Sequence, residues 1–313
     1  MVVTRADLEA SLAALRRQIA DPCAGILGPR SLAWQIGGDL AVFLGGGRAA
    51  LLQLAHPMVA YAIAQHSRTR ADVAGRFQRT FRSVFAMVFG DLDEAFRAAR
   101  CVHAIHAAIH GTIPEAVGGW AVGTPYWAND AEALRWVHAT LVDTTLVVRE
   151  RLDGALPEAI KDDYVIEMNR VAALLGVPEA LLPRSHAAHV SYMRQMLGSD
   201  RIAVAPCARE MASFLVGRAG DRQPWLGRIA EAVTALLLPP PLAAAFALRG
   251  APRLAGVGLA AFGRVHRRVP SRVRGIPARS NAERRLAGQP PSRVDAWAER
   301  GLYGLAQRAT GRV

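Results

Sequence analysis

Apolar residues recur every three or four positions along most of this chain, and this spacing constrains the fold more than any other feature. Near the N-terminus, Leu8, Leu12, Leu15 and Ile19 follow it, so they would form one face of a helix. No stretch shows the strict apolar–polar alternation between hairpin turns that is typical of a half-buried strand. The sequence therefore predicts an all-α protein of one domain with about ten to thirteen helices.

The composition excludes several classes of protein. Of the 313 residues, 51% are hydrophobic, which is enough for one sizeable core. The longest charge-free runs, residues 49–65 and 232–248, are too short to span a bilayer as a helix. The first 20 residues mix acids and bases, unlike a secretory signal, so we expect a cytoplasmic protein. The three cysteines lie far apart, which argues against a disulfide framework and a cysteine–zinc site.

Positive charge is concentrated in the last fifth of the chain. Residues 249–313 carry 14 arginines and three acids, whereas residues 1–248 carry 24 basic and 23 acidic residues. We therefore expect a helical core over residues 1–248 and a basic helical extension over residues 249–313, packed on that core. No nucleic-acid motif occurs, so nucleic acid is not an expected partner. A solvated helical face explains the charge, and peripheral contact with an anionic membrane is the functional alternative.

Several common catalytic motifs are missing. There is no phosphate-binding G-x-x-x-x-G-K-[ST] loop and no G-x-S-x-G elbow, which nucleotide hydrolases and α/β-hydrolases need. A helical di-iron centre would need Glu-x-x-His pairs on two helices, and none is present.

Histidines cluster between residues 101 and 111. His103, His106 and His110 stand at i, i+3 and i+7, so they would share one face of a helix that ends near Gly111. Imidazole is costly to bury without a partner, and it is the commonest metal ligand. These histidines either form a polar face without a ligand or bind a metal or a haem iron.

Other polar side chains fall inside apolar helical segments. Arg76 and Thr80 are four residues apart, so they would share a helix face and point at one ligand. His138 lies within an apolar helix, where a buried polar group needs a partner. His186 and His189 form a second possible ligand pair, which we rank lower because the neighbouring residues look exposed.

A glycine-rich segment, Gly45-Gly-Gly-Arg48, precedes an apolar helix. Its backbone N–H groups could face an anion such as a phosphate or carboxylate. A tight helix–helix connection explains the same glycines equally well. For the region as a whole, haem needs one axial imidazole, an apolar slot between helices, and cationic or hydroxyl groups for its propionates and bound dioxygen. Residues 76–140 contain all of these residue types.

The order and spacing of several short motifs are similar to those of one oxygenase family. The motifs are Leu44-Gly-Gly-Gly-Arg48, Gln53-x-Ala-His-Pro57, His66-Ser67, Arg76-x-x-Arg-Thr80, Val102-His-x-x-His106, Ala128-Asn-Asp130 and Trp136-Val-His-Ala-Thr-Leu-Val-Asp143. Together they resemble the family of rubber oxygenase (latex-clearing protein) and the MpaB-type oxygenases. The resemblance covers roughly residues 27–197 in order.

This resemblance implies a globin-like helical core that binds one b-type haem. It implies cleavage of carbon–carbon double bonds with dioxygen in an apolar, isoprenoid- or lipid-like substrate. Carried over by position, the axial ligand to the haem iron falls on His106. His103, His110, His138 or a backbone carbonyl could supply the hydrogen bond that orients this imidazole. His103, His138 and Arg48 are the further cofactor-binding candidates.

The resemblance also places a distal, catalytic group on Arg76, Arg79 and Thr80. Arg79 stands where rubber oxygenase has a lysine able to cap the iron, and a guanidinium is a much poorer ligand than an amine. The glutamate proposed as a base in rubber oxygenase has no match here, and Gln65 and His66 are the nearest polar residues. These departures argue against polyisoprene as the substrate and leave the expectation of haem binding unchanged.

Two alternatives remain open from the sequence. One is a haem- or lipid-binding protein without turnover. The other is an enzyme that holds a divalent metal or non-haem iron through histidines, drawn from His103, His106, His110 and His138.

Overall fold

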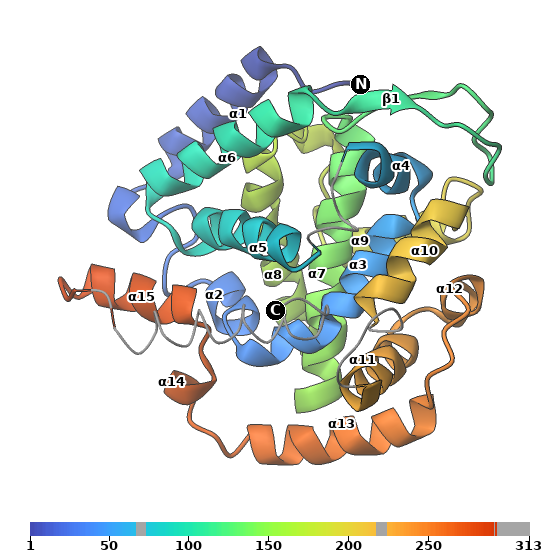
Figure 1. The fold of residues 1–313 in the computed structure, drawn as a ribbon. Helices are drawn as coiled ribbons and strands as arrows, with labels where there is room; N and C mark the ends of the chain where they lie inside the picture. The colour runs from blue at the N-terminus through green and yellow to red at the C-terminus, as the bar shows by residue number, and fades with distance from the viewer. Residues whose placement is uncertain (67–72, 217–223, 291, 293–313) are drawn as a thin grey trace.

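The computed structural model describes residues 1–66, 73–216, 224–290 and 292. This part of the chain contains fifteen α-helices, three short 3-10 helices and one small antiparallel sheet (Figure 1). The prediction of an all-α protein is confirmed. The number of helices exceeds the predicted range because three of them have six residues or fewer, namely α2 (Leu32–Gly37), α12 (Pro240–Ala245) and α14 (Ser271–Arg274).

The longer helices are, in chain order, α1 (Arg5–Gln18), α3 (Gly46–Leu54), α4 (Pro57–His66), α5 (Val73–Phe89), α6 (Leu92–Ala107), α7 (Ala131–Asp153), α8 (Glu158–Leu174), α9 (His186–Leu197), α10 (Pro206–Leu215), α11 (Pro224–Leu237), α13 (Pro252–His266) and α15 (Pro277–Leu286). The 3-10 helices are η1 (Pro22–Ala24), η2 (Leu40–Gly45) and η3 (Glu179–Leu181). The two strands are β1 (His110–Thr112) and β2 (Pro125–Trp127).

Helix α7 runs through the middle of the molecule, and other helices pack around it (Figure 1). It begins where the side chain of Asp130 accepts hydrogen bonds from the backbone N–H groups of Glu132 and Ala133, which is the usual role of an N-cap aspartate. Buried residues occur on most sides of the helix, as expected for a helix with neighbours all round. The indole of Trp136 donates to the carbonyl of Leu52 at 3.0 Å and ties α7 to α3.

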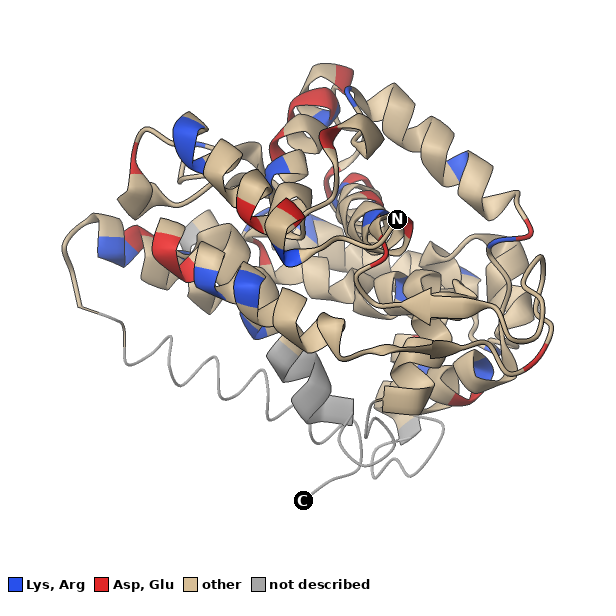
Figure 2. Ribbon diagram, turned by 90° about the horizontal axis from the view of Figure 1, so that it is seen from above, with Lys and Arg blue, Asp and Glu red and all other residues tan. Residues whose placement is uncertain are grey.

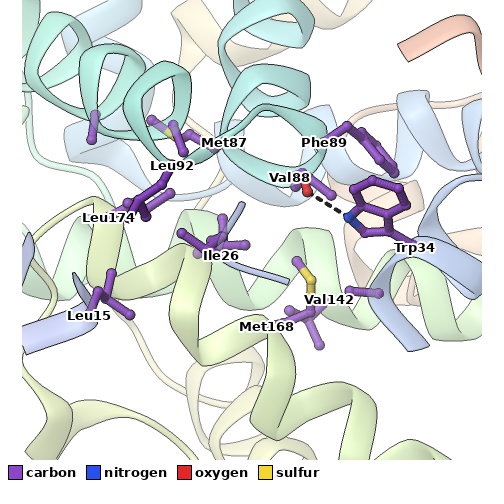
Figure 3. Packing of buried hydrophobic residues seen from close by; sticks show 14 of the residues in the cluster. Leu15, Ile26, Trp34, Met87, Val88, Phe89, Leu92, Val142, Met168 and Leu174 are labelled. Carbon is purple, nitrogen blue, oxygen red and sulfur yellow. Dashed lines mark hydrogen bonds between the residues drawn. The ribbon is translucent and has the colours of Figure 1, made fainter. Parts of the chain in front are cut away.

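The largest hydrophobic core lies between α1, α2, α5, α6 and α8 (Figure 3). The predicted apolar face of α1 is part of it, since Leu8, Leu12 and Leu15 are buried. Trp34 is also fully buried, and its indole N–H donates to the carbonyl of Val88 at 2.8 Å. A polar atom of a buried aromatic ring is thereby satisfied, so the core can hold the large tryptophan without a penalty.

The end of α6 differs from the prediction. The helix ends at Ala107, and His110 begins β1, which pairs with β2. The backbone N–H of Ala128 bonds to the carbonyl of Ile109 at 2.9 Å, so pairing with a distant segment replaces the last expected helical turn. The prediction that His110 shares a helix face with the two earlier histidines is therefore wrong.

The basic C-terminal segment is built into the molecule. Ile276 and Ala282 belong to the largest core, and Asp39 bonds to His266 of α13 at 2.8 Å. Asp39 also pairs with Arg274 of α14 at 3.3 Å. These contacts join residues 266–282 to the first 248 residues, and the division of the chain at residue 249 stays a prediction. No helix among the described residues is long and apolar enough to cross a membrane.

Candidate functional site

Helices α5 and α6 form a hairpin that carries most of the predicted site residues. They are joined through Gly90 and Asp91 and pack against each other, and in Figure 1 they diverge from this turn. His103 and His106 lie near the end of α6, and residues 76–80 lie near the start of α5. Both sets are therefore at the helix ends away from the connecting turn. The side chains of Arg76 and Arg79 lie outside the described part of the structure, and Thr80 is exposed.

The inward face of α6 changes from apolar residues to histidines along its length. Leu92, Ala95, Phe96 and Ala99 are buried, and the partly buried His103 and His106 continue this stripe at steps of four and three residues. The Nδ1 atom of His106 is buried. The face therefore ends in two partly buried imidazole groups.

The three predicted histidines have different surroundings. The Nε2 atom of His103 lies 3.0 Å from the carbonyl oxygen of Val3, and Asn129 donates to the carbonyl of His103 at 3.1 Å. His110 is exposed in β1, where it pairs with Trp127. Two of the three histidines thus share the α6 face, and His103 is held by the N-terminal segment.

Gln65 and His66, the polar residues nearest to the position of the missing glutamate, join α4 to the small sheet. Gln65 accepts a hydrogen bond from the Tyr126 hydroxyl at 2.6 Å and donates to the carbonyl of Thr112 at 3.1 Å. His66 lies with Nε2 2.9 Å from the carbonyl oxygen of His110. Both side chains therefore form hydrogen bonds with residues of the sheet.

Arg48 belongs to a buried polar cluster between α3, α7 and the end of α11. Its guanidinium donates to Asp143 at 2.5 Å, to Thr144 at 2.7 Å and to the carbonyl of Leu237 at 2.8 Å. Burial opposes ionisation of Asp143, but nearby His189 and Arg48 outweigh it and hold the pKa of this carboxyl below its usual value. The ion pair of Arg48 and Asp143 links α3 to α7, and neither residue belongs to the α5–α6 hairpin.

The glycines before Arg48 allow this close packing. Gly46 and Gly47 belong to α3 itself. A Cβ atom on Gly45 would collide with the side chain of Thr144, and one on Gly47 would collide with that of Thr234. Of the two interpretations of this segment, the structure favours the tight helix connection over an anion site.

His138 lines a small pocket between α7, α8 and α9. Burial lowers the pKa of His138 to about 3, with a further contribution from nearby His189, so the ring is neutral. The pocket has a volume of about 10 Å³, which is room for about one water molecule. Three polar atoms of its lining residues are buried without a hydrogen-bond partner among the described residues: His189 Nε2, Tyr192 Oη and Asn169 Oδ1.

His189 is buried, although its neighbours in the sequence indicate an exposed position. It lies almost fully inside the protein, with Nε2 3.6 Å from Asp143 Oδ1. A pattern was available to find it, because His189, Met193 and Met196 repeat at four and three residues and are all buried. His186, in contrast, bonds to Glu158 at 2.9 Å on the outer side of α9.

His56 is another buried histidine, and the residue patterns did not single it out as a site residue. Its ring lies 5.3 Å from that of Trp120, and both of its nitrogens are buried without a hydrogen-bond partner among the described residues. Burial, together with the positive charge of Arg201, lowers the pKa of His56 to about 4. The ring is thus a neutral part of the core around α3 and α4.

No group of three or more His, Cys, Asp or Glu side chains in the described ranges is arranged to hold a metal ion. A haem iron makes a smaller demand on the protein, because the porphyrin supplies four ligands and one axial imidazole completes the attachment.

Comparison with known families gives one match. The sequence model of the family described as "ER-bound oxygenase mpaB/B'/Rubber oxygenase, catalytic domain" matches residues 34–268. This range contains the α5–α6 hairpin and the clusters around Arg48 and His138. Comparisons with curated proteins and with solved structures give no match.

Proposed function

Because the chain belongs to the mpaB/rubber oxygenase catalytic-domain family, we propose that it is a haem b-dependent oxygenase that acts with dioxygen on an apolar, isoprenoid- or lipid-like substrate. The observation that carries the proposal is the position of His106. It continues the buried stripe of α6 with its Nδ1 atom buried, on the hairpin that also carries Arg76, Arg79 and Thr80.

The residues present fit a haem. His106 offers one imidazole whose Nδ1 side is buried in protein, and an axial histidine needs its second nitrogen directed toward the protein. Apolar aromatic groups lie farther along the same hairpin, where Phe81 and Phe85 of α5 contact Phe43 of η2 with ring centroids 5.1 and 6.1 Å from that of Phe43. Such rings suit the apolar faces of a porphyrin.

Each residue of the hairpin has a proposed role. A bound haem supplies the dioxygen chemistry. His106 would hold the iron through a neutral imidazole, and the charges of Arg76 and Arg79 would attract the propionates or orient bound polar groups. Since a guanidinium stays protonated, Arg79 would act as a hydrogen-bond donor and not as a ligand. The hydroxyl of Thr80 would donate or accept a hydrogen bond on the side of the haem where Arg79 lies.

The other predicted cofactor residues would contribute indirectly. His103 shares the α6 face, and its contact with Val3 would fix the last turn of the helix that carries His106. Arg48 and His138 lie outside the α5–α6 hairpin, in polar groups that meet at Asp143 and His189, so a direct role for them in holding haem stays a prediction from the sequence.

Haem content of purified variants tests the proposal. The wild-type protein should show a Soret band, and His106→Ala should retain haem about tenfold less well or worse, because it removes the imidazole that would hold the iron. His110→Ala is a matched control, since it removes an imidazole four residues away that is exposed on β1. His138→Ala should keep both haem content and Soret position.

The other outcomes separate the alternatives. Loss of haem from His138→Ala with full retention by His106→Ala would mean that His138 is the ligand. A colourless wild-type protein that contains zinc or iron would favour the histidine-ligated metal enzyme. A haem protein that consumes no dioxygen with any apolar alkene would favour a carrier.

A further inference from the structure

Helix α13 lies at the outer edge of the molecule, along the bottom of Figure 1. Its inner face is packed, since Leu259, Gly263 and His266 are buried. Its outer face is apolar and uncovered: Leu254 is 75% exposed, Val257 71% and Val265 62%. These three residues, at steps of three and eight, fall on one side of the helix.

Positive charge borders this apolar face. Arg253, Arg264 and Arg268 are exposed, and within the described part of the chain none of them forms a salt bridge. No acidic residue occurs in the sequence between Glu231 and Glu283. The surface of α13 therefore combines bare aliphatic side chains with arginines whose charge has no neighbouring carboxylate along the chain.

In the view of Figure 2, basic and acidic residues are interspersed along the helices. Helix α13, in contrast, contains no acidic residue. An outer helix with aliphatic residues on its exposed side and arginines beside them is typical of a helix that lies in a membrane interface. Arginine can extend its apolar stem along lipid while its guanidinium reaches the phosphates.

We propose that α13 is a docking surface for a membrane that contains anionic phospholipid. Leu254, Val257 and Val265 enter the boundary between headgroups and acyl chains, and Arg253, Arg264 and Arg268 pair with lipid phosphates. Charge complementarity selects this partner, because the arginines favour an anionic surface over a neutral one. The inference does not depend on haem or on turnover, so it stands or falls separately from the proposed function.

Vesicle co-sedimentation of the full chain tests the proposal. The protein should bind vesicles of phosphatidylcholine mixed with phosphatidylglycerol, bind phosphatidylcholine alone about tenfold more weakly, and dissociate as salt rises. Leu254→Ser with Val257→Ser should weaken binding about tenfold. Ile166→Ser is the matched control, because Ile166 is an aliphatic residue of α8 that is 49% exposed, and it should bind like the wild type.

The charge is tested in the same way. Arg253→Glu with Arg264→Glu should weaken binding about tenfold or more, whereas Arg194→Glu, on the exposed side of α9, should have little effect. Equal binding to neutral and mixed vesicles, no binding by the wild type, or equal losses in the control variants would each overturn the proposal. So would a change in oligomeric state on size exclusion for Leu254→Ser with Val257→Ser without a change in vesicle binding, because a second copy of the chain would then cover α13.

Discussion

At the scale of single residues, the buried histidines limit the conditions under which this protein is stable. His56 and His138 are neutral inside the protein because burial disfavours the imidazolium form, and their pKa values fall to about 4 and about 3. In the unfolded chain both rings would return to an ordinary pKa near 6.5. Protonation therefore favours the unfolded chain at mildly acidic pH.

The sign of this pH dependence can be tested at His56. Its contribution to stability is complete above pH 6.5 and is lost as the pH falls from 6.5 toward about 4. In His56→Leu, the unfolding free energy should fall less steeply across this range than in the wild type, by up to about 1.4 kcal/mol per pH unit. Urea titrations at several pH values measure the slope.

The control for this experiment is His110→Leu, at an exposed histidine. Its stability should follow the wild-type slope, and any loss of packing in His56→Leu should appear as an offset at neutral pH. A His56→Leu slope identical to that of the wild type would show that another group takes up the proton.

At the scale of elements, the contact of α3 with its neighbours depends on the absence of side chains at particular positions. Gly47→Ala should lower the unfolding free energy by about 1–3 kcal/mol, because the new methyl group would collide with the buried side chain of Thr234. Gly46→Ala is the matched control, since a Cβ there meets no atom within 4 Å. It should be neutral or stabilising by about 0.5–1 kcal/mol, as expected for alanine in place of glycine in a helix.

Equilibrium unfolding in urea measures both variants. If Gly46→Ala were as destabilising as Gly47→Ala, the glycines would be needed for backbone freedom and not for close approach.

At the scale of the whole molecule, the C-terminal helices unfold with the rest of the protein if the core is continuous. Ile276 is fully buried, and its backbone N–H bonds to the carbonyl of Gly38 at 2.9 Å. Ile276→Ala should therefore lower global stability by about 2–5 kcal/mol. Val273→Ala, at a residue that is 66% exposed, should change it by less than about 0.5 kcal/mol.

Tryptophan fluorescence and far-UV circular dichroism should report one coincident transition for both variants. An early transition of Ile276→Ala, with the rest of the protein unfolding at the wild-type midpoint, would show instead that residues beyond 248 form a separate unit.

The sequence by itself determined features that depend on nearby residues. It predicted the helical class and the buried stripe of α1, and the structure confirms them. The reason is physical: apolar periodicity is set by residues three or four positions apart. The order of short motifs also sufficed to identify the oxygenase family, because it needs no knowledge of contacts.

Only the tertiary structure decided where chain segments meet. The end of α6 was set by pairing with β2, the surroundings of Arg48 by Asp143, 95 positions away, and the burial of His189 by its position in the pocket beside His138. Each depends on atoms that are distant in sequence, and a helical pattern indicates which side faces inward without indicating what lies opposite. The exposure of the apolar face of α13 was likewise decided by the tertiary structure, because exposure depends on how the whole molecule packs and not on the helix alone.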